Sequence, residues 1–190
     1  MSEVTTPVES TPRRGRTLRI VAVVVGVIAA AFIAVLATRQ PTEVGQAASP
    51  LLGQPAPQID GASLDGQPVS LASLQGHYVL VNFFASWCGP CHTELPNLVA
   101  LARAHPDLKV IGVAFNDSST SASGFLASGG AEWPAVADPD EHIALSYGVR
   151  APPESYLVDP EGMVVAKIIG GIDQTRVRSI EDYLSGGGSR

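Results

Sequence analysis

The two cysteines of the chain, Cys88 and Cys91, are separated by only two residues and lie between an apolar run and a helical pattern. Residues 78–84 are almost continuously apolar, as expected of a strand buried on both faces. From Pro90 onward, apolar residues recur at helical spacing. A cysteine at the start of a helix gains from the helix dipole and the free backbone N–H groups, which favour its thiolate. Because the thiolate is the species that attacks a disulfide, this arrangement predicts thiol–disulfide exchange.

Two other interpretations of the cysteine pair are a structural disulfide and a metal site. Structural bridges usually close longer loops, because a longer loop constrains the unfolded chain more. A zinc site needs more ligands, whereas the chain has no second cysteine pair and its four histidines are scattered at positions 77, 92, 105 and 142. The short gap therefore favours a bond that breaks and re-forms, with no metal and no cofactor beyond the Cys88–Cys91 disulfide.

The N-terminal segment has the pattern of a membrane-targeting segment. Residues 20–37 contain no charge, and eighteen residues meet the lower limit for a spanning helix. Four arginines lie within residues 1–19, which predicts a basic cytoplasmic N-terminus followed by a transmembrane signal anchor over 20–37. The rest of the chain then faces the periplasm or the cell-wall side. A cleaved signal peptide is the alternative, although its apolar core usually spans roughly 7–15 residues.

Beyond the anchor, the sequence divides into a linker, a folded domain and a tail. Residues 38–56 are rich in Pro, Gly, Ala, Ser and Thr and show no apolar periodicity. Residues 57–185 carry the regular patterns, and residues 186–190 form a flexible glycine-rich tail. Residues 40–190 have a net charge of −9, so the domain lacks the basic surface that nucleic-acid binding requires.

The order of strand and helix patterns indicates an α/β fold. A β-α-β opening and a β-β-α ending imply a central mixed sheet with helices on both faces. Asp173 is a candidate N-cap for the last helix. The expected elements are a hairpin over 60–71, strands over 78–84, 108–115, 155–159 and 164–169, and helices from 90 to about 102 and over 118–128, 140–147 and 173–184.

The run Trp-Cys-Gly-Pro-Cys at 87–91 resembles the active site of the thioredoxin superfamily. The chain is more closely similar to the membrane-tethered, extracytoplasmic thiol:disulfide interchange proteins of cytochrome c biogenesis, the DsbE/CcmG and TlpA/ResA group. The matches continue through Glu-Leu-Pro at 94–96 and through residues 110–117 and 147–159. The resemblance implies a three-layer thioredoxin-like fold over residues 57–185.

The resemblance also assigns roles to three side chains. Cys88 is expected to be the attacking thiolate, and Cys91 is expected to resolve the mixed disulfide. Glu94 lies one helical turn after Cys91, where a carboxylate could exchange a proton with the Cys91 thiol. The alternative for Glu94 is a solvent-facing helix residue. Asn82 departs from ordinary thioredoxins, which carry a buried aspartate there.

Five further residues are expected around the cysteines. Trp87 packs beside the active site in the family, and the Gly89-Pro90 pair matches that of thioredoxin, which favours a reductant. Pro153 matches the cis-proline that faces the cysteines and leaves a backbone edge for an extended substrate. Glu154 is expected near the active site, where it would favour a basic or heme-motif-bearing partner.

The sequence thus predicts a thiol:disulfide oxidoreductase outside the cytoplasmic membrane. Its expected substrates are protein disulfides, specifically that of an apocytochrome c heme-binding motif, and its expected electron donor is a membrane protein of the DsbD/CcdA type. Other readings are a general disulfide reductase or isomerase, an oxidase, and a non-enzymatic metal or heme chaperone. Copper carriers on this fold use a three-residue cysteine spacing, so the spacing of Cys88 and Cys91 argues against the chaperone.

Overall fold

The computed structural model describes residues 20–28, 31 and 49–186. The chain divides into two compact units, residues 1–43 and residues 44–190. In the first unit, residues 20–28 and 31 are helical, and the large apolar side chains of 20–28 are exposed. No helix in the described part of the chain is both long and apolar enough to span a membrane. The remaining residues of the predicted anchor, 29–30 and 32–37, lie outside the described residues, as do 1–19, 38–48 and 187–190.

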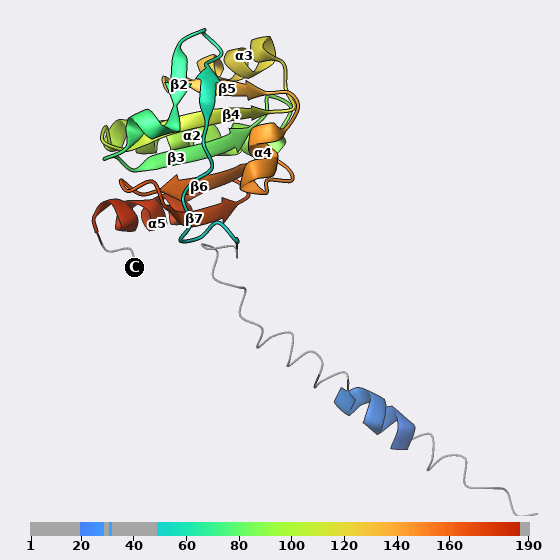
Figure 1. The fold of residues 1–190 in the computed structure, drawn as a ribbon. Helices are drawn as coiled ribbons and strands as arrows, with labels where there is room; N and C mark the ends of the chain where they lie inside the picture. Colours follow the sequence, from blue (N-terminus) through green and yellow to red (C-terminus); the bar gives the residue numbers. More distant parts are fainter. Residues whose placement is uncertain (1–19, 29–30, 32–48, 187–190) are drawn as a thin grey trace, which may run out of the picture. The chain divides into compact units, whose positions relative to one another are not determined.

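The second unit is built on a five-stranded mixed sheet, which confirms the α/β part of the predicted fold class (Figure 1). Its strand order is β5-β4-β3-β6-β7. The central strand β3 (Val79–Phe84) pairs in parallel with β4 (Lys109–Phe115) and antiparallel with β6 (Glu154–Val158). The edges are β5 (Ala135–Asp138) and β7 (Val164–Ile169). All six residues of β3 are buried, as the apolar run predicts.

Helices cover both faces of this sheet, also as predicted. Residues of α2 (Gly89–Ala104), α3 (Ser119–Gly129) and α5 (Gln174–Leu184) pack against the face that carries Leu80. The opposite face is covered by α4 (His142–Tyr147) and by the N-terminal segment of the domain. In Figure 1, α4 and the hairpin lie in front of the sheet and α2 lies behind it. The sheet therefore has an apolar core on each side.

The predicted hairpin is present as a separate two-stranded sheet. β1 (Asp60–Ala62) pairs antiparallel with β2 (Pro68–Ser70), and a short 3-10 helix, η1 (Leu71–Leu74), follows. Gly66 has φ 84°, and its N–H donates to Ser63 O at 2.9 Å. A positive φ suits glycine because it has no Cβ. The turn predicted from the Asp-Gly pair is therefore confirmed.

Two elements were missed from the sequence, η1 and β5. β5 has four residues and lies between two prolines, so its pattern is too short to identify a strand. It pairs with β4 in parallel and ends at the buried Asp138. The Asp138 carboxylate accepts the N–H groups of Ile143 and Ala144 at 3.1 and 2.8 Å, and so fixes the start of α4.

The last residues of the predicted linker lie against the sheet. Gly53 N donates to Val164 O at 2.8 Å, and Ala56 N donates to Gly162 O at 2.9 Å. Pro55 forms an isolated antiparallel bridge with Met163. Residues 53–56 are thus part of the folded domain.

Candidate active site

Cys88 and Cys91 form a disulfide at the N-terminus of α2, with their Cα atoms 5.3 Å apart. Cys88 is the N-cap residue, and its Sγ accepts the N–H of Cys91 at 3.2 Å. Cys88 is 4% exposed and Cys91 is fully buried. A sulfur in this position faces the positive end of the helix dipole, which stabilises a thiolate once the bond is reduced. Cys88 is therefore the better placed of the two sulfurs to attack.

The loop before Cys88 is held by the loop between β4 and α3 and by α2. Asp117 Oδ2 accepts the N–H of Ser86 at 2.6 Å, and His92 Nε2 lies 2.8 Å from Ser86 O. Trp87 is 60% exposed, and its Nε1 donates to Asn116 O at 3.2 Å. The contacts of Ser86 fix the approach of the chain to Cys88, while the indole remains on the surface beside the disulfide.

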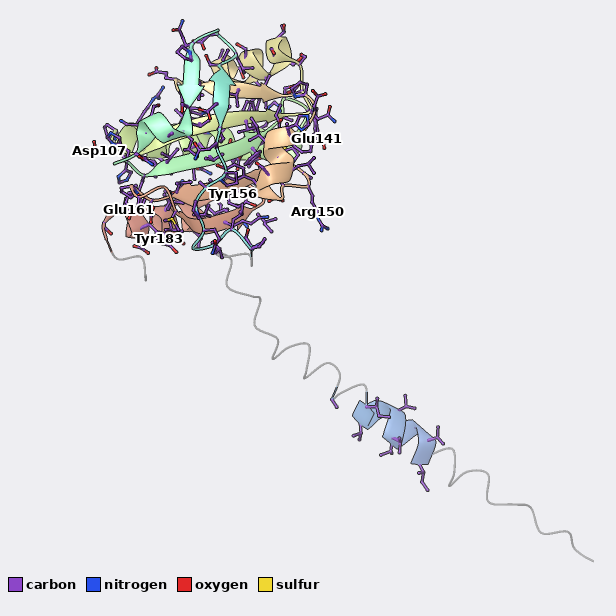
Figure 2. The ribbon with its side chains drawn as sticks, viewed as in Figure 1. Asp107, Glu141, Arg150, Tyr156, Glu161 and Tyr183 are labelled. Atoms are coloured by element: carbon purple, nitrogen blue, oxygen red, sulfur yellow. A yellow bond between two sulfur atoms is a disulfide. The ribbon has the colours of Figure 1, made fainter. Side chains whose placement is uncertain are left out.

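The site lies at one end of the sheet, where β3 and β4 end. Asn116, just after β4, donates through Nδ2 to Glu141 Oε1 at 3.0 Å. Figure 2 shows Glu141 and Arg150 at one end of the domain and Asp107 at the other. Ligand sites of open α/β sheets lie at the carboxyl ends of the parallel strands, so the disulfide is at the expected end.

Glu94 is not a solvent-facing residue: it is 2% exposed and accepts two hydrogen bonds. Asn82 Nδ2 donates to its Oε1 at 3.0 Å, and Ile172 N donates to its Oε2 at 2.9 Å. Burial raises the pKa of Glu94 from 4.5 to about 7, although both hydrogen bonds and the charge of Arg176 oppose the increase. A carboxyl group with such a pKa can both accept and release a proton near neutral pH.

Asn82, which stands where ordinary thioredoxins have an aspartate, is the polar link beneath α2. Its Nδ2 donates to both Glu94 Oε1 and Ser155 Oγ, each at 3.0 Å. Asn82 and Ser155 face each other across the β3–β6 pair. The sequence gives no sign of the contacts with Ser155 and Ile172, because they join residues 73 and 78 positions apart.

The peptide bond between Pro152 and Pro153 is cis, as the resemblance implies. Pro153 is buried and directly precedes β6. Its carbonyl oxygen accepts the N–H of Gly170 at 2.9 Å. One of the two acceptor positions of this carbonyl is therefore used by the turn that follows β7.

Glu154 lies in a different environment from the one expected. It is 6% exposed, and its Oε2 lies 2.8 Å from Lys167 Nζ. Lys167 also lies over the ring of Tyr156, 5.2 Å from its centroid. The carboxylate is thus neutralised inside the domain and is not available as a surface charge for a partner.

The described residues contain no group of three or more His, Cys, Asp and Glu side chains placed to hold a metal ion.

Among known protein families, the AhpC/TSA family matches residues 52–167 of the chain. The chain belongs to this family. It is 35% identical over 140 residues to the thiol:disulfide interchange protein HelX of Rhodobacter capsulatus, covering 72% of this chain and 78% of HelX. It is 31% identical over 135 residues to the thiol-disulfide oxidoreductase ResA of Bacillus anthracis, covering 70% and 76%.

The fold agrees with solved structures of similar proteins. A crystal structure of a putative DsbE from Chlorobium tepidum matches with a TM-score of 0.65 and 27% identity, covering 73% of this chain and 98% of that one. The chain is therefore a thioredoxin-like thiol:disulfide oxidoreductase of the DsbE/ResA type, and it acts on substrate disulfides.

Proposed function

We propose that this protein is a membrane-tethered reductase acting outside the cytoplasmic membrane, where it reduces the disulfide of an apocytochrome c heme-binding motif. The observation that carries the proposal is the placement of the buried Glu94 one helical turn beyond the Cys88–Cys91 disulfide. Two observations support a reductase and not an oxidase: the relatives named DsbE and ResA, and the Gly89-Pro90 pair between the cysteines. The uncharged residues 20–37 support the tether.

In the first step, the Cys88 thiolate attacks one sulfur of the substrate disulfide. A new bond forms between Cys88 Sγ and that sulfur, and the other substrate sulfur leaves as a thiolate. The helix N-terminus, with the N–H of Cys91 3.2 Å from Cys88 Sγ, favours the attacking thiolate.

In the second step, Cys91 attacks Cys88 Sγ and releases the second substrate thiolate. The substrate has then gained two electrons and the enzyme disulfide has re-formed. Cys91 must lose its proton for this attack, and Glu94, with a pKa of about 7, is the proposed acceptor. A membrane electron donor of the DsbD/CcdA type would then return the Cys88–Cys91 pair to the dithiol.

The test uses the reduced full-length protein and an oxidised Cys-x-x-Cys-His peptide, the heme-attachment sequence. The wild-type protein should release two peptide thiols, detected by mass spectrometry. Cys88→Ser should release none, and Cys91→Ser should accumulate a mixed disulfide between Cys88 and the peptide. If Cys88→Ser reduced the peptide at the wild-type rate, the assignment of the attacking residue would be wrong.

Glutathione disulfide serves as the matched control substrate. A clear preference for the heme-motif peptide supports the proposed substrate. Equal rates with both substrates would instead favour a general extracytoplasmic reductase. Net formation of peptide disulfides from peptide thiols would reverse the direction and favour an oxidase.

A further inference from the structure

The turn that follows β7, residues 170–172, joins the cis-proline to the buried carboxylate. At one end, Gly170 N donates to Pro153 O at 2.9 Å. At the other end, Ile172 N donates to Glu94 Oε2 at 2.9 Å, while Asn97 Nδ2 donates to Ile172 O at 2.8 Å. The position of this turn therefore decides where a donor for Glu94 lies.

Arg176, in the first turn of α5, holds the middle of the same turn. Its Nη1 donates to the carbonyl oxygen of Gly171. The helix that carries Arg176 is itself fixed by Asp173, whose Oδ1 accepts the N–H groups of Thr175 and Arg176, each at 3.0 Å. The guanidinium also acts directly on Glu94, because its charge lowers the pKa of that carboxyl group.

Gly171 shows how closely the turn lies over the carboxylate. A Cβ on Gly171 would be 3.6 Å from Glu94 Cβ and 3.8 Å from Glu94 Oε2. It would also be 3.5 Å from Pro90 O, in the first turn of α2. These are ordinary van der Waals distances, so the turn lies in contact with Glu94, and its position decides whether Ile172 N reaches Glu94 Oε2.

From these contacts we propose that Arg176 is a positioning residue for Glu94, acting through its charge and through the 170–172 turn that it holds. The inference rests on the proposed role of Glu94 in proton transfer to and from Cys91. Arg176 touches neither cysteine in this account. It keeps a backbone donor on Glu94 Oε2 and a positive charge nearby, and both favour the ionised carboxylate that accepts the proton.

The groups around Glu94 define what a titration would report. On its own helix, Cys91 is the titratable neighbour one turn earlier. β3 and β6 contribute the uncharged Asn82 and Ser155. The α5 side contributes Arg176, with the exposed Asp173 interacting with that guanidinium. In the disulfide form Cys91 does not titrate, so the oxidised protein isolates the effect of Arg176 on Glu94.

The experiment follows the Glu94 carboxyl carbon by NMR in the oxidised full-length protein as the pH is raised, with Glu94→Gln used to assign the signal. Arg176→Gln should move the titration midpoint upward by about 0.5–1 pH unit, at or below the low end of what a nearby charge produces. In the reduced protein, the pH midpoint for release of the heme-motif peptide should move in the same direction. Arg178→Gln is the matched control, since Arg178 is exposed on the same helix and contacts Thr175 Oγ1; its midpoint should equal that of the wild type.

Gly171→Ala is a second variant, which changes the turn and keeps the positive charge of Arg176. Its methyl group should make contact without a clash and further dehydrate the carboxylate, so the midpoint should again rise. An unchanged midpoint in Arg176→Gln would overturn the proposal while leaving the role of Glu94 intact. An unchanged midpoint in Gly171→Ala would show that the 170–172 turn does not act on Glu94, and would overturn that part of the proposal. If Glu94→Gln itself left the pH profile of peptide release unchanged, the proposed role of Glu94 would fall, and this inference with it.

Discussion

The buried carboxyl group of Glu94 predicts an unusual pH dependence of stability. Its pKa is raised from 4.5 to about 7 in the folded protein. Since one pKa unit corresponds to about 1.4 kcal/mol, the increase corresponds to about 3 kcal/mol. The folded state holds the proton more tightly than the unfolded state, so the favourable contribution is fully present below about pH 4.5 and is lost as the pH rises through about 7.

The perturbation that isolates this contribution is Glu94→Gln in the oxidised protein. Glutamine cannot ionise, so the variant lacks the part of the pH dependence that Glu94 causes. Its amide NH₂ would face one of the two donors, Asn82 Nδ2 or Ile172 N. The variant should therefore be less stable than the wild type by about 1–3 kcal/mol at low pH.

The assay is urea unfolding of both proteins at intervals between pH 4 and pH 8.5. The free energy of unfolding of the wild type minus that of Glu94→Gln should fall by about 3 kcal/mol across this range, most of it between pH 4.5 and 7. A constant difference across the range would refute the reasoning, because it would mean that Glu94 ionises alike in the folded and unfolded chains.

Two further substitutions test the structural account. Lys167→Met leaves the carboxylate of Glu154 buried without its cation. We expect the free energy of unfolding in urea to fall by about 3–5 kcal/mol. A fall of less than about 1 kcal/mol would mean that the pair is effectively solvated. Asp173→Ala removes the N-cap of α5 and should cost about 1 kcal/mol, measured in the same way. An unchanged midpoint for Asp173→Ala would show that α5 does not depend on this cap.

Local chemistry made much of the fold predictable. The continuous apolar run of β3, the Asp-Gly turn of the first hairpin and the cap at Asp173 each carry their signal within a few residues. β5 could not be found in this way, because four residues between prolines give no usable period. Its place is decided by pairing with β4, which is a tertiary contact.

In the candidate site, too, features carried by local sequence were predictable and those that depend on tertiary contacts were not. Cys88 and Cys91 can be identified from the sequence, because their spacing and their place at the start of a helix are local features. The burial of Glu94 depends instead on Asn82 and on the turn at Ile172, which come from distant parts of the chain. The pairing of Glu154 with Lys167 was missed for the same reason, since it requires the register between β6 and β7.

The most direct test of the central claim is the reduction potential of the Cys88–Cys91 couple, measured by equilibrating the protein with glutathione or dithiothreitol buffers. A protein that donates electrons to a substrate disulfide should have a value near or below that of thioredoxin, roughly −270 mV. A value near roughly −120 mV, typical of a protein that inserts disulfides, would contradict the proposed direction of exchange.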